Sequence, residues 1–143
     1  MTANELRIGN IIRQAHATLT VVSISSETVV CDDGNNHVSR CHYKNVDPIL
    51  LTDNLMALGF KTVGMDYIIM LNTPDRNLII MEIKDFFYPV IEQLGELSGE
   101  RTNVVHLNRI KFIHELQNLY YTLTGEELAI VKFIEKDYTI SPD

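Results

Sequence analysis

The sequence predicts an α+β fold, and three observations support this prediction. Short segments rich in β-branched residues fill most of the chain, two helical patterns interrupt them, and the connections have the length of hairpin loops. Such connections favour antiparallel pairing, because parallel neighbours need a crossover of a dozen or more residues. With 143 residues, of which 45% are hydrophobic, the chain can bury a normal core as one compact domain or two very small ones.

The first third of the chain has the pattern of a small β-rich unit. "DDGNN" has the composition of a hairpin loop, and Asp47-Pro48 marks a boundary because the residue before a proline is disfavoured in the helical region. We therefore expect a β-rich, SH3-like unit over residues 1–48 and an α+β unit over 49–143. The strands expected in the first unit span residues 11–14, 19–25, 28–32 and 37–43.

The second unit opens with "LTDNLMALGF", which predicts a two-turn helix over 52–58. Thr52 is the expected N-cap, and Asp53 lies where the helix dipole favours a negative charge. Gly59 can adopt the left-handed conformation that ends a helix, and Phe60 can then fold back onto it.

An antiparallel meander is expected next. "DYIIMLN" and "RNLIIMEIKD" flank Thr73-Pro74-Asp75, which has the composition of a tight turn and predicts a hairpin. Residues 86–97 fit a helix by the spacing of their apolar residues and a strand by their content of Phe, Tyr, Val and Ile. We expect a strand over 86–93, a loop, and a partner strand over 102–110.

The stretch "IKFIHELQNLYYTLTGEEL" predicts a helix over 111–124 that ends at Thr124-Gly125, with a final strand over 127–134. On a helical wheel, an apolar stripe faces the sheet and a polar arc faces the opposite side. The stripe consists of Phe112, Leu116, Leu119 and Leu123, flanked by Ile113 and Tyr120. The arc consists of His114, Gln117, Asn118 and Tyr121.

This arc is the candidate binding face of the chain. A tyrosine among amide and imidazole groups suits a recognition patch or an interface. Two other interpretations stay open. The four side chains could bond to neighbouring strands or pack beneath the first unit, or they could belong to an active site.

Composition disfavours some classes of function. The formal net charge of −7 and the scattered Lys and Arg residues argue against general nucleic-acid binding, which needs clustered cations. An acidic surface suits a basic protein partner, including one that normally holds nucleic acid, although acidity also simply favours solubility. The polar start of the chain and the strand-sized apolar runs indicate a cytoplasmic protein with reduced cysteines and no membrane span.

Motif searches predict no catalytic residue, no metal and no cofactor. The spacing of Cys31, His37, Cys41 and His42 matches no standard zinc site, and the two cysteines are better interpreted as small hydrophobic side chains of a hairpin. No nucleophile motif and no glycine-rich phosphate loop is present. His106 and His114 remain the titratable groups that a small enzyme or ligand-binding domain would use.

Three segments carry a family resemblance: "NELRIGN", "PILLTDNLMALGF" and "LNRIKFIHELQNLYYTLTGEEL". In this order they resemble a family of small uncharacterised proteins of bacterial genomes, prophages and phages, with a C-terminal HELQNLYxxLTGEEL signature. The resemblance implies a small accessory protein of a mobile element in a bacterial host cell, and it carries no catalytic residue. The residues that match are Leu6, Arg7, Gly9, Asn10, His114, Glu115, Leu116, Gln117, Asn118, Leu119, Thr124, Gly125, Glu126 and Glu127.

The leading hypothesis is therefore a non-enzymatic phage or prophage protein that binds a protein partner. One form of it is an inhibitor of a host defence system, whose acidic surface competes for a nucleic-acid channel. The alternative is a small enzyme or ligand-binding domain that uses His106 or His114. A third hypothesis is nucleic-acid binding by the β-rich unit through Arg7, Arg13, Arg40 and Lys44.

Overall fold

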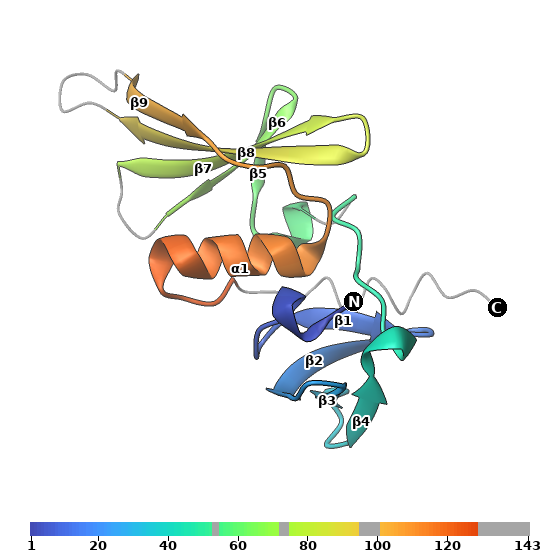
Figure 1. The fold of residues 1–143 in the computed structure, drawn as a ribbon. Coiled ribbons are helices and arrows are strands. Elements are labelled where there is room, and N and C mark those ends of the chain that lie inside the picture. The colour runs from blue at the N-terminus through green and yellow to red at the C-terminus, as the bar shows by residue number, and fades with distance from the viewer. Residues whose placement is uncertain (53–54, 72–74, 95–100, 129–143) are drawn as a thin grey trace.

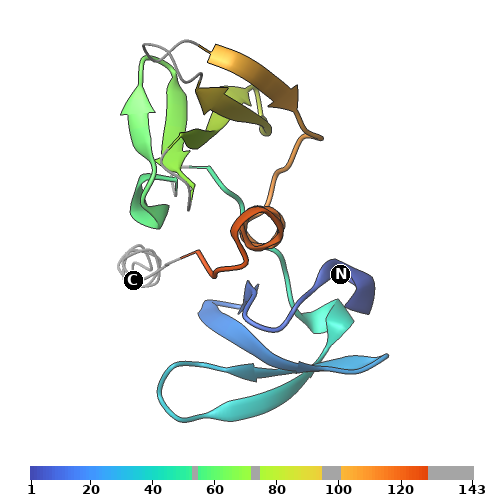
Figure 2. The same ribbon diagram turned by 90° about the vertical axis from the view of Figure 1, so that its left-hand side faces the viewer.

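A computed structural model of the chain describes residues 1–52, 55–71, 75–94 and 101–128. The described residues form two antiparallel sheets, of four and five strands, with the helix α1 (Ile113–Thr124) between them (Figure 1). Viewed along α1, the five-stranded sheet curves over one side of the helix and the four-stranded sheet lies on the other (Figure 2). The predicted α+β class is confirmed.

The four-stranded sheet is a meander in which each strand pairs with the next. Its strands are β1 (Ile11–Gln14), β2 (Ala17–Ile24), β3 (Thr28–Asp32) and β4 (Val38–His42), close to the predicted spans. In the loop between β3 and β4, the Asp33 carboxylate accepts the backbone N–H groups of Asn35 (2.8 Å) and His37 (3.3 Å). Two short 3₁₀ turns that the sequence did not predict flank this sheet: η1 (Ala3–Glu5) and η2 (Tyr43–Asn45).

Both cysteines lie in the core of this sheet, as the sequence predicted. Cys31 and Cys41 are buried free thiols that pack with Val21 and Val29. Burial, together with the neighbouring Cys41, raises the pKa of the Cys31 thiol to about 11.

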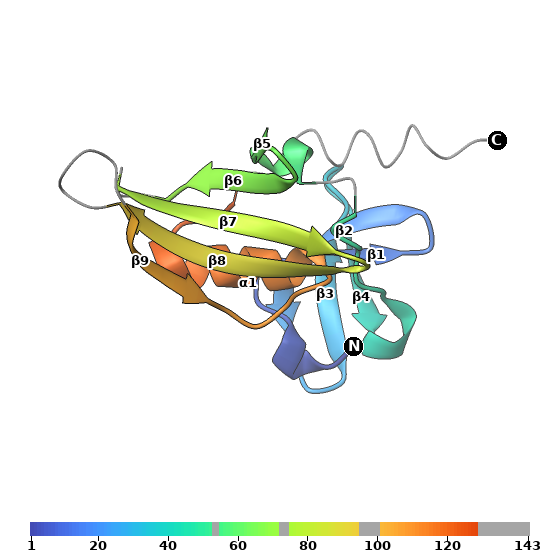
Figure 3. The same ribbon diagram turned by 90° about the horizontal axis from the view of Figure 1, so that it is seen from above.

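The five-stranded sheet is also a meander, and Figure 3 shows its strands side by side across α1. Its strands are β5 (Lys61–Val63), β6 (Asp66–Met70), β7 (Arg76–Ile83), β8 (Phe86–Leu94) and β9 (Arg101–His106). The β6–β7 hairpin and the strand over 86–93 are confirmed, whereas β5 was not predicted. The partner strand expected over 102–110 ends at His106. Beyond it, the N–H of Leu107 bonds to the carbonyl of Pro89 at 3.0 Å, and Ile110 rejoins the sheet by a bridge to Phe87.

The predicted helix over 52–58 is wrong in type. Its described part contains a 3₁₀ turn, η3 (Met56–Leu58), and the N–H of Gly59 bonds to the carbonyl of Met56 at 3.2 Å. A short segment gains little from helix formation alone, and here Leu55 and Leu58 both enter the core, which favours a tight turn. Gly59 does adopt the left-handed conformation, with φ 92°. Asp53 lies outside the described residues.

The C-terminal strand expected over 127–134 has no counterpart at its first two positions, since Glu127 and Leu128 lie in no strand. Residues 129–134 lie outside the described part of the chain. Leu128 is buried in the core that α1 shares with the five-stranded sheet, so an apolar contact rather than strand pairing fixes it.

The apolar stripe of α1 packs as predicted against the five-stranded sheet. Leu116 and Ile113 are fully buried there, and Leu119, Tyr120 and Leu123 pack around them. The strand residues of this core include Leu78, Ile80 and Phe87, which alternate with residues on the outer face. Phe112 precedes the helix instead of forming part of its stripe.

Both ends of α1 have side-chain or backbone caps. Glu115 Oε1 accepts the backbone N–H groups of Lys111 (2.9 Å) and Phe112 (3.0 Å), which are not bonded within the helix. Gly125, with φ 75°, ends the helix by donating its N–H to the carbonyl of Tyr121 at 2.8 Å. The helix therefore begins two residues later than predicted and ends at the predicted Thr124.

We expect Cys31 to react slowly with thiol reagents at neutral pH. A thiol with a pKa of about 11 holds very little thiolate at pH 7, and the side chain is buried. Iodoacetamide labelling of the native chain, followed by mass spectrometry of the peptides, measures this rate. Labelling in denaturant is the control, and labelling as fast in the native chain as in denaturant would contradict the packing described.

Candidate functional site

The polar arc of α1 faces the four-stranded sheet. Figure 1 shows the helix lying directly above β1 and η1, and the hydrogen bonds of Gln117 and Asn118 reach residues 5–11. Of the interpretations open for this arc, contact with the first unit is the one that the described hydrogen bonds support.

Gln117 binds the backbone of the first strand. Its side chain is buried, its Oε1 accepts the N–H of Ile11 at 2.8 Å, and its Nε2 donates to the carbonyl of Gly9 at 3.0 Å. A primary amide has one N–H on the same side as its C=O, so a single side chain can bond both groups at once. Gln117 therefore binds the first N–H of β1 and the carbonyl of the turn residue before it.

Asn118 lies beside it and binds three groups of the N-terminal segment. Its Oδ1 accepts Asn10 Nδ2 at 2.8 Å and Arg7 Nε at 3.1 Å, and its Nδ2 donates to the carbonyl of Glu5 at 3.4 Å. Asn10 is fully buried, and its Oδ1 accepts the backbone N–H of Arg7 at 2.7 Å. A buried amide needs such partners, since an unsatisfied one costs about 1–3 kcal/mol.

Arg7 connects the outer end of this network to the residues after the helix. Its guanidinium lies 4.2 Å from the centre of the Tyr121 ring and forms a two-pronged contact with the carboxylate of Glu127. Its Nη2 also donates to the carbonyl of Gln117 at 3.5 Å. The planar fork of arginine suits a carboxylate and an aromatic face at once, which lysine could not reproduce.

Gly9 allows this close approach. It has φ 98°, and a Cβ atom there would lie 3.1 Å from Glu127 Oε1. "NELRIGN" and the HELQNLYYTLTGEEL stretch, singled out separately in the sequence, thus bind each other in space. The roles of Arg7, Asn10 and Glu127 in this contact were not predicted. The sequence signal that could have indicated the contact is the presence of both motifs in one chain.

Tyr121 is the member of the arc that keeps a large accessible surface, with 42% exposure. Gln117 and Asn118 are accounted for by contacts within the chain, and Arg7 covers one face of the tyrosine ring. Binding of a partner at this face stays a prediction.

His114, the fourth residue of the arc, is 4% exposed and lies in the first turn of α1. Its ring stacks on Phe112, with 5.8 Å between centroids, and its Nδ1 has no hydrogen-bond partner among the described residues. Burial lowers the pKa of His114, whereas Glu115 and Glu5 act to raise it and the N-terminal amine to lower it. The histidine forms one wall of a hollow of about 240 Å³, lined also by Glu5, Pro48, Phe112 and Glu115.

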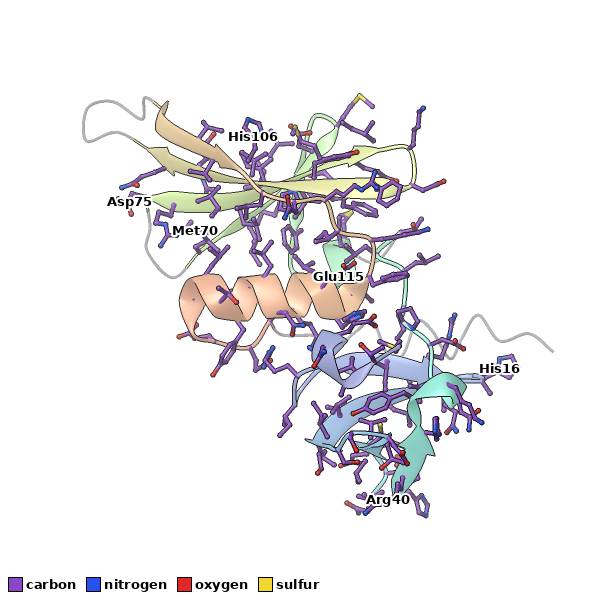
Figure 4. All side chains as sticks on the ribbon, viewed as in Figure 1. His16, Arg40, Met70, Asp75, His106 and Glu115 are labelled. Carbon is purple, nitrogen blue, oxygen red and sulfur yellow. The ribbon has the colours of Figure 1, made fainter. Side chains whose placement is uncertain are left out.

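His106, the other candidate histidine, lies far from this hollow. It is exposed at the end of β9, and Figure 4 shows it on the side of the five-stranded sheet opposite α1. The structure therefore does not bring the two histidines together. Among the described residues, no three His, Cys, Asp or Glu side chains are grouped as metal ligands.

The cations considered for nucleic-acid binding are also dispersed. Arg7 is engaged with Glu127 and Tyr121, whereas Arg40 lies at the far side of the four-stranded sheet (Figure 4). Within the described part of the chain, no helix has the length and hydropathy needed to cross a membrane.

No family model, no curated protein and no solved structure matches this chain.

We expect Gln117→Ala to lower the free energy of unfolding by about 2–4 kcal/mol, because it removes two hydrogen bonds and leaves the buried N–H of Ile11 and the part-buried carbonyl of Gly9 without this partner. Urea denaturation followed by circular dichroism measures the change. Thr122→Ser, on an exposed site of the same helix, is the control, because it keeps the hydroxyl that donates to the carbonyl of Asn118 at 2.8 Å, and it should change stability by no more than about 0.5 kcal/mol. A loss below about 1 kcal/mol for Gln117→Ala would contradict the role assigned to this amide.

We expect the stability of the chain to fall as the pH drops below about 6.5, where the unfolded His114 takes up a proton that the folded state resists. The loss should continue until the pH reaches the lowered pKa of the folded state, with a slope of at most about 1.4 kcal/mol per pH unit. Urea titrations between pH 5 and 8 measure this slope. His114→Gln should reduce it, whereas His16→Gln, in an exposed turn, should not, and equal slopes for native chain and His114→Gln would contradict the assignment.

Proposed function

We propose that this chain is a non-enzymatic accessory protein of phage or prophage origin that binds a protein partner through the outer face of its five-stranded sheet. The observation that carries the proposal is the apolar character of that face, which lies opposite α1 (Figure 1). Within the described residues, the helix α1 covers one side of the sheet and no helix covers the other. Exposed apolar patches on a small protein commonly mark interaction sites.

The strand register gives the composition of this face. One row of paired residues crosses all five strands: Lys61, Ile68, Ile79, Val90 and His106. Ile79 and Val90, at the centre of this row, are 7% and 5% exposed although they lie on the side away from the helix. Neighbouring side chains of the same face therefore cover them, and these include the hydrogen-bonded pair of Asn77 and Glu92 as well as apolar residues.

The margins of the face are apolar and accessible. Val63, Met70 and Val104 have exposed fractions of 58%, 60% and 43%. Beside them lies a shallow hollow of about 350 Å³, lined by Gly59, Lys61, Val63, Ile68, Ile69, Met70 and Asn77. Accessible apolar side chains beside a hollow are typical of a surface that binds a partner.

Charge supports a basic partner. The chain has a formal net charge of −7, and on this face Asp66 and Lys61 offset each other, so the attraction to a basic partner comes from the chain as a whole. A host defence protein with a nucleic-acid channel has the complementary surface, so we propose inhibition by occupation of such a channel as the specific form of this function. The resemblance to phage and prophage proteins favours the same setting.

A second function, ligand binding by a small domain, has support at His114 and not at His106, because only His114 lines a hollow with carboxylates beside it. We also propose that the four-stranded meander is an SH3-like unit, since its strands are short and its hairpins tight.

We expect a Met70→Gln/Val104→Thr double variant to lose at least about tenfold in affinity for the partner, because interface anchors dominate binding energy. The full chain, tagged and immobilised, is used to capture proteins from bacterial lysate, and the affinity of the recovered partner is then measured by calorimetry. Val38→Thr is the matched control, since Val38 is 61% exposed on β4 of the other sheet. Equal affinity of the double variant and the control, or recovery of no partner, would overturn the proposal.

A further inference from the structure

The edge of β9 is an apolar strand edge that the described part of the chain leaves open. β9 is the last strand of its sheet and has six residues. The other three strand edges are protected in ways that are typical of soluble proteins: Gln117 and Asp47 bond to β1, β5 has only three residues, and β4 carries the charged Arg40. An open edge can pair with an extended chain, so β9 is the edge to consider for binding.

The strand register identifies which backbone groups of β9 are open. The N–H of Leu107 bonds to the carbonyl of Pro89 at 3.0 Å, and bonded and non-bonded pairs alternate along an antiparallel ladder. Val105, two residues before Leu107, therefore also directs its N–H and C=O toward β8. Val104 and His106 direct theirs to the opposite side, where no strand and no other backbone group of the described residues bonds to them.

The side chains of this edge are apolar and accessible on both faces of the sheet. Val104 lies on the outer face and is 43% exposed, and Val105 lies on the opposite face and is 50% exposed. Ile91, the register partner of Val105, packs in the core with α1, so the helix covers β8 at this point but leaves Val105 half exposed. An added strand would cover both valines, because cross-strand neighbours lie in contact on each face.

Two cations lie beyond the end of this edge. The guanidinium of Arg109 lies 4.0 Å from the centre of the Phe86 ring, and Lys111 Nζ lies 5.5 Å from the same centre. The chain that carries them follows β8 past His106, through the bonds of residues 107 and 110. Within the part of the chain that the structure describes, neither cation forms an ion pair with a carboxylate. The edge of β9 therefore ends in local positive charge.

The position of these cations selects the chemistry of a bound segment. An antiparallel strand added to β9 begins opposite His106, so the residues that precede it lie nearest to Arg109 and Lys111. Carboxylates there would form the ion pairs that the chain itself does not supply. The net charge of −7 has less influence on a short segment, because salt screens charges beyond roughly 8 Å. It disfavours a second copy of the chain, which would bring the same net charge.

We propose that β9 binds an extended segment of another polypeptide as an added antiparallel strand, and that acidic residues immediately before this segment bind Arg109 and Lys111. Backbone hydrogen bonds to Val104 and His106 supply affinity, and the acidic residues fix the direction of the added strand. This inference goes beyond the proposed function, because it concerns the edge of the sheet and not its outer face.

The first test follows amide hydrogen exchange of the full chain by NMR. The probe is a blocked peptide of two Glu residues followed by three Thr-Val repeats. We expect the amides of Val104 and His106 to exchange fast in the free chain and at least about tenfold more slowly with saturating peptide, whereas the amide of Val105 is already protected by β8. Slow exchange of Val104 and His106 in the free chain, or no slowing by the peptide, would overturn the proposal.

The second test uses peptides that are methylated on the backbone nitrogens of either the Val or the Thr residues. Alternate N–H groups of a strand point to opposite sides, so one series faces β9 and the other faces solvent. We expect one methylated peptide to lose at least about tenfold in affinity and the other to bind within about threefold of the parent peptide. Similar affinities of the two methylated peptides would show that side chains alone hold the peptide, which contradicts strand addition. This test does not depend on the folding of any protein variant.

The third test changes the edge itself. Val104→Pro removes an N–H that faces the open edge and leaves the bonds to β8 intact, so it should weaken peptide binding at least about tenfold. Val38→Pro is the matched control, because the bond between Asp33 and His37 shows that Val38 directs its N–H away from β3, and it should leave binding unchanged. Equal affinity of the two variants would contradict the site.

Charge is tested by replacing the two Glu residues of the peptide with Lys. We expect at least about fivefold weaker binding of the Lys peptide, and Arg109→Gln/Lys111→Gln should remove this difference. Equal binding of the Glu and Lys peptides to the native chain would overturn the assignment of an acidic segment. Sedimentation of the chain without peptide separates the remaining occupant, since dimerisation that Val104→Pro abolishes would assign the edge to a second copy and overturn the proposal.

Discussion

The open edge of β1 is the constraint on which the arrangement of the two units depends. An edge strand presents backbone groups that must find partners when they are buried. Here Gln117 satisfies the groups of Gly9 and Ile11, and two reciprocal hydrogen bonds between Arg13 and Asp47, at 2.9 and 2.7 Å, cover the next part of the edge. Gln117 of α1 and Asp47 of the connection therefore bond to the same edge of β1. These bonds fix how α1 crosses the first sheet.

Polar and apolar contacts have different roles around α1. Leu116 and Ile113 are buried in the core shared with the five-stranded sheet, and burial of this kind supplies most of the stabilising free energy. The opposite side adds hydrogen bonds from Gln117 and Asn118, each of modest net value because folding exchanges them for bonds to water. These hydrogen bonds instead specify the orientation of α1, because a shift of the helix along the first sheet would leave the bonded groups without partners.

The sequence predicted the helices and strands better than it predicted which of them contact each other. Periodicity of the helix gave both its apolar stripe and its polar arc, because those depend only on residues three and four apart. The same pattern could not identify what the arc meets, since Arg7 and Asn118 are separated by 111 positions. Local rules also failed where an element was very short: β5 has three residues, and the segment around Met56 forms a 3₁₀ turn because packing, not propensity, decides its conformation.

The distribution of surface character bears on function as well as on folding. The contact between the two units is rich in polar side chains, whereas the outer face of the five-stranded sheet has Ile79 and Val90 at its centre and further apolar residues at its margins. Residues such as Val104 and Met70 contribute little to the core, because they remain 43% and 60% exposed, so folding alone gives no reason for their apolar character. Polar residues would serve a solvated sheet face as well and would lower the risk of aggregation. Exposed apolar side chains on this face are thus a cost to the isolated chain that a partner would offset. The proposed binding surface is therefore better placed on the sheet than on the helix arc, whose amides are bonded within the chain.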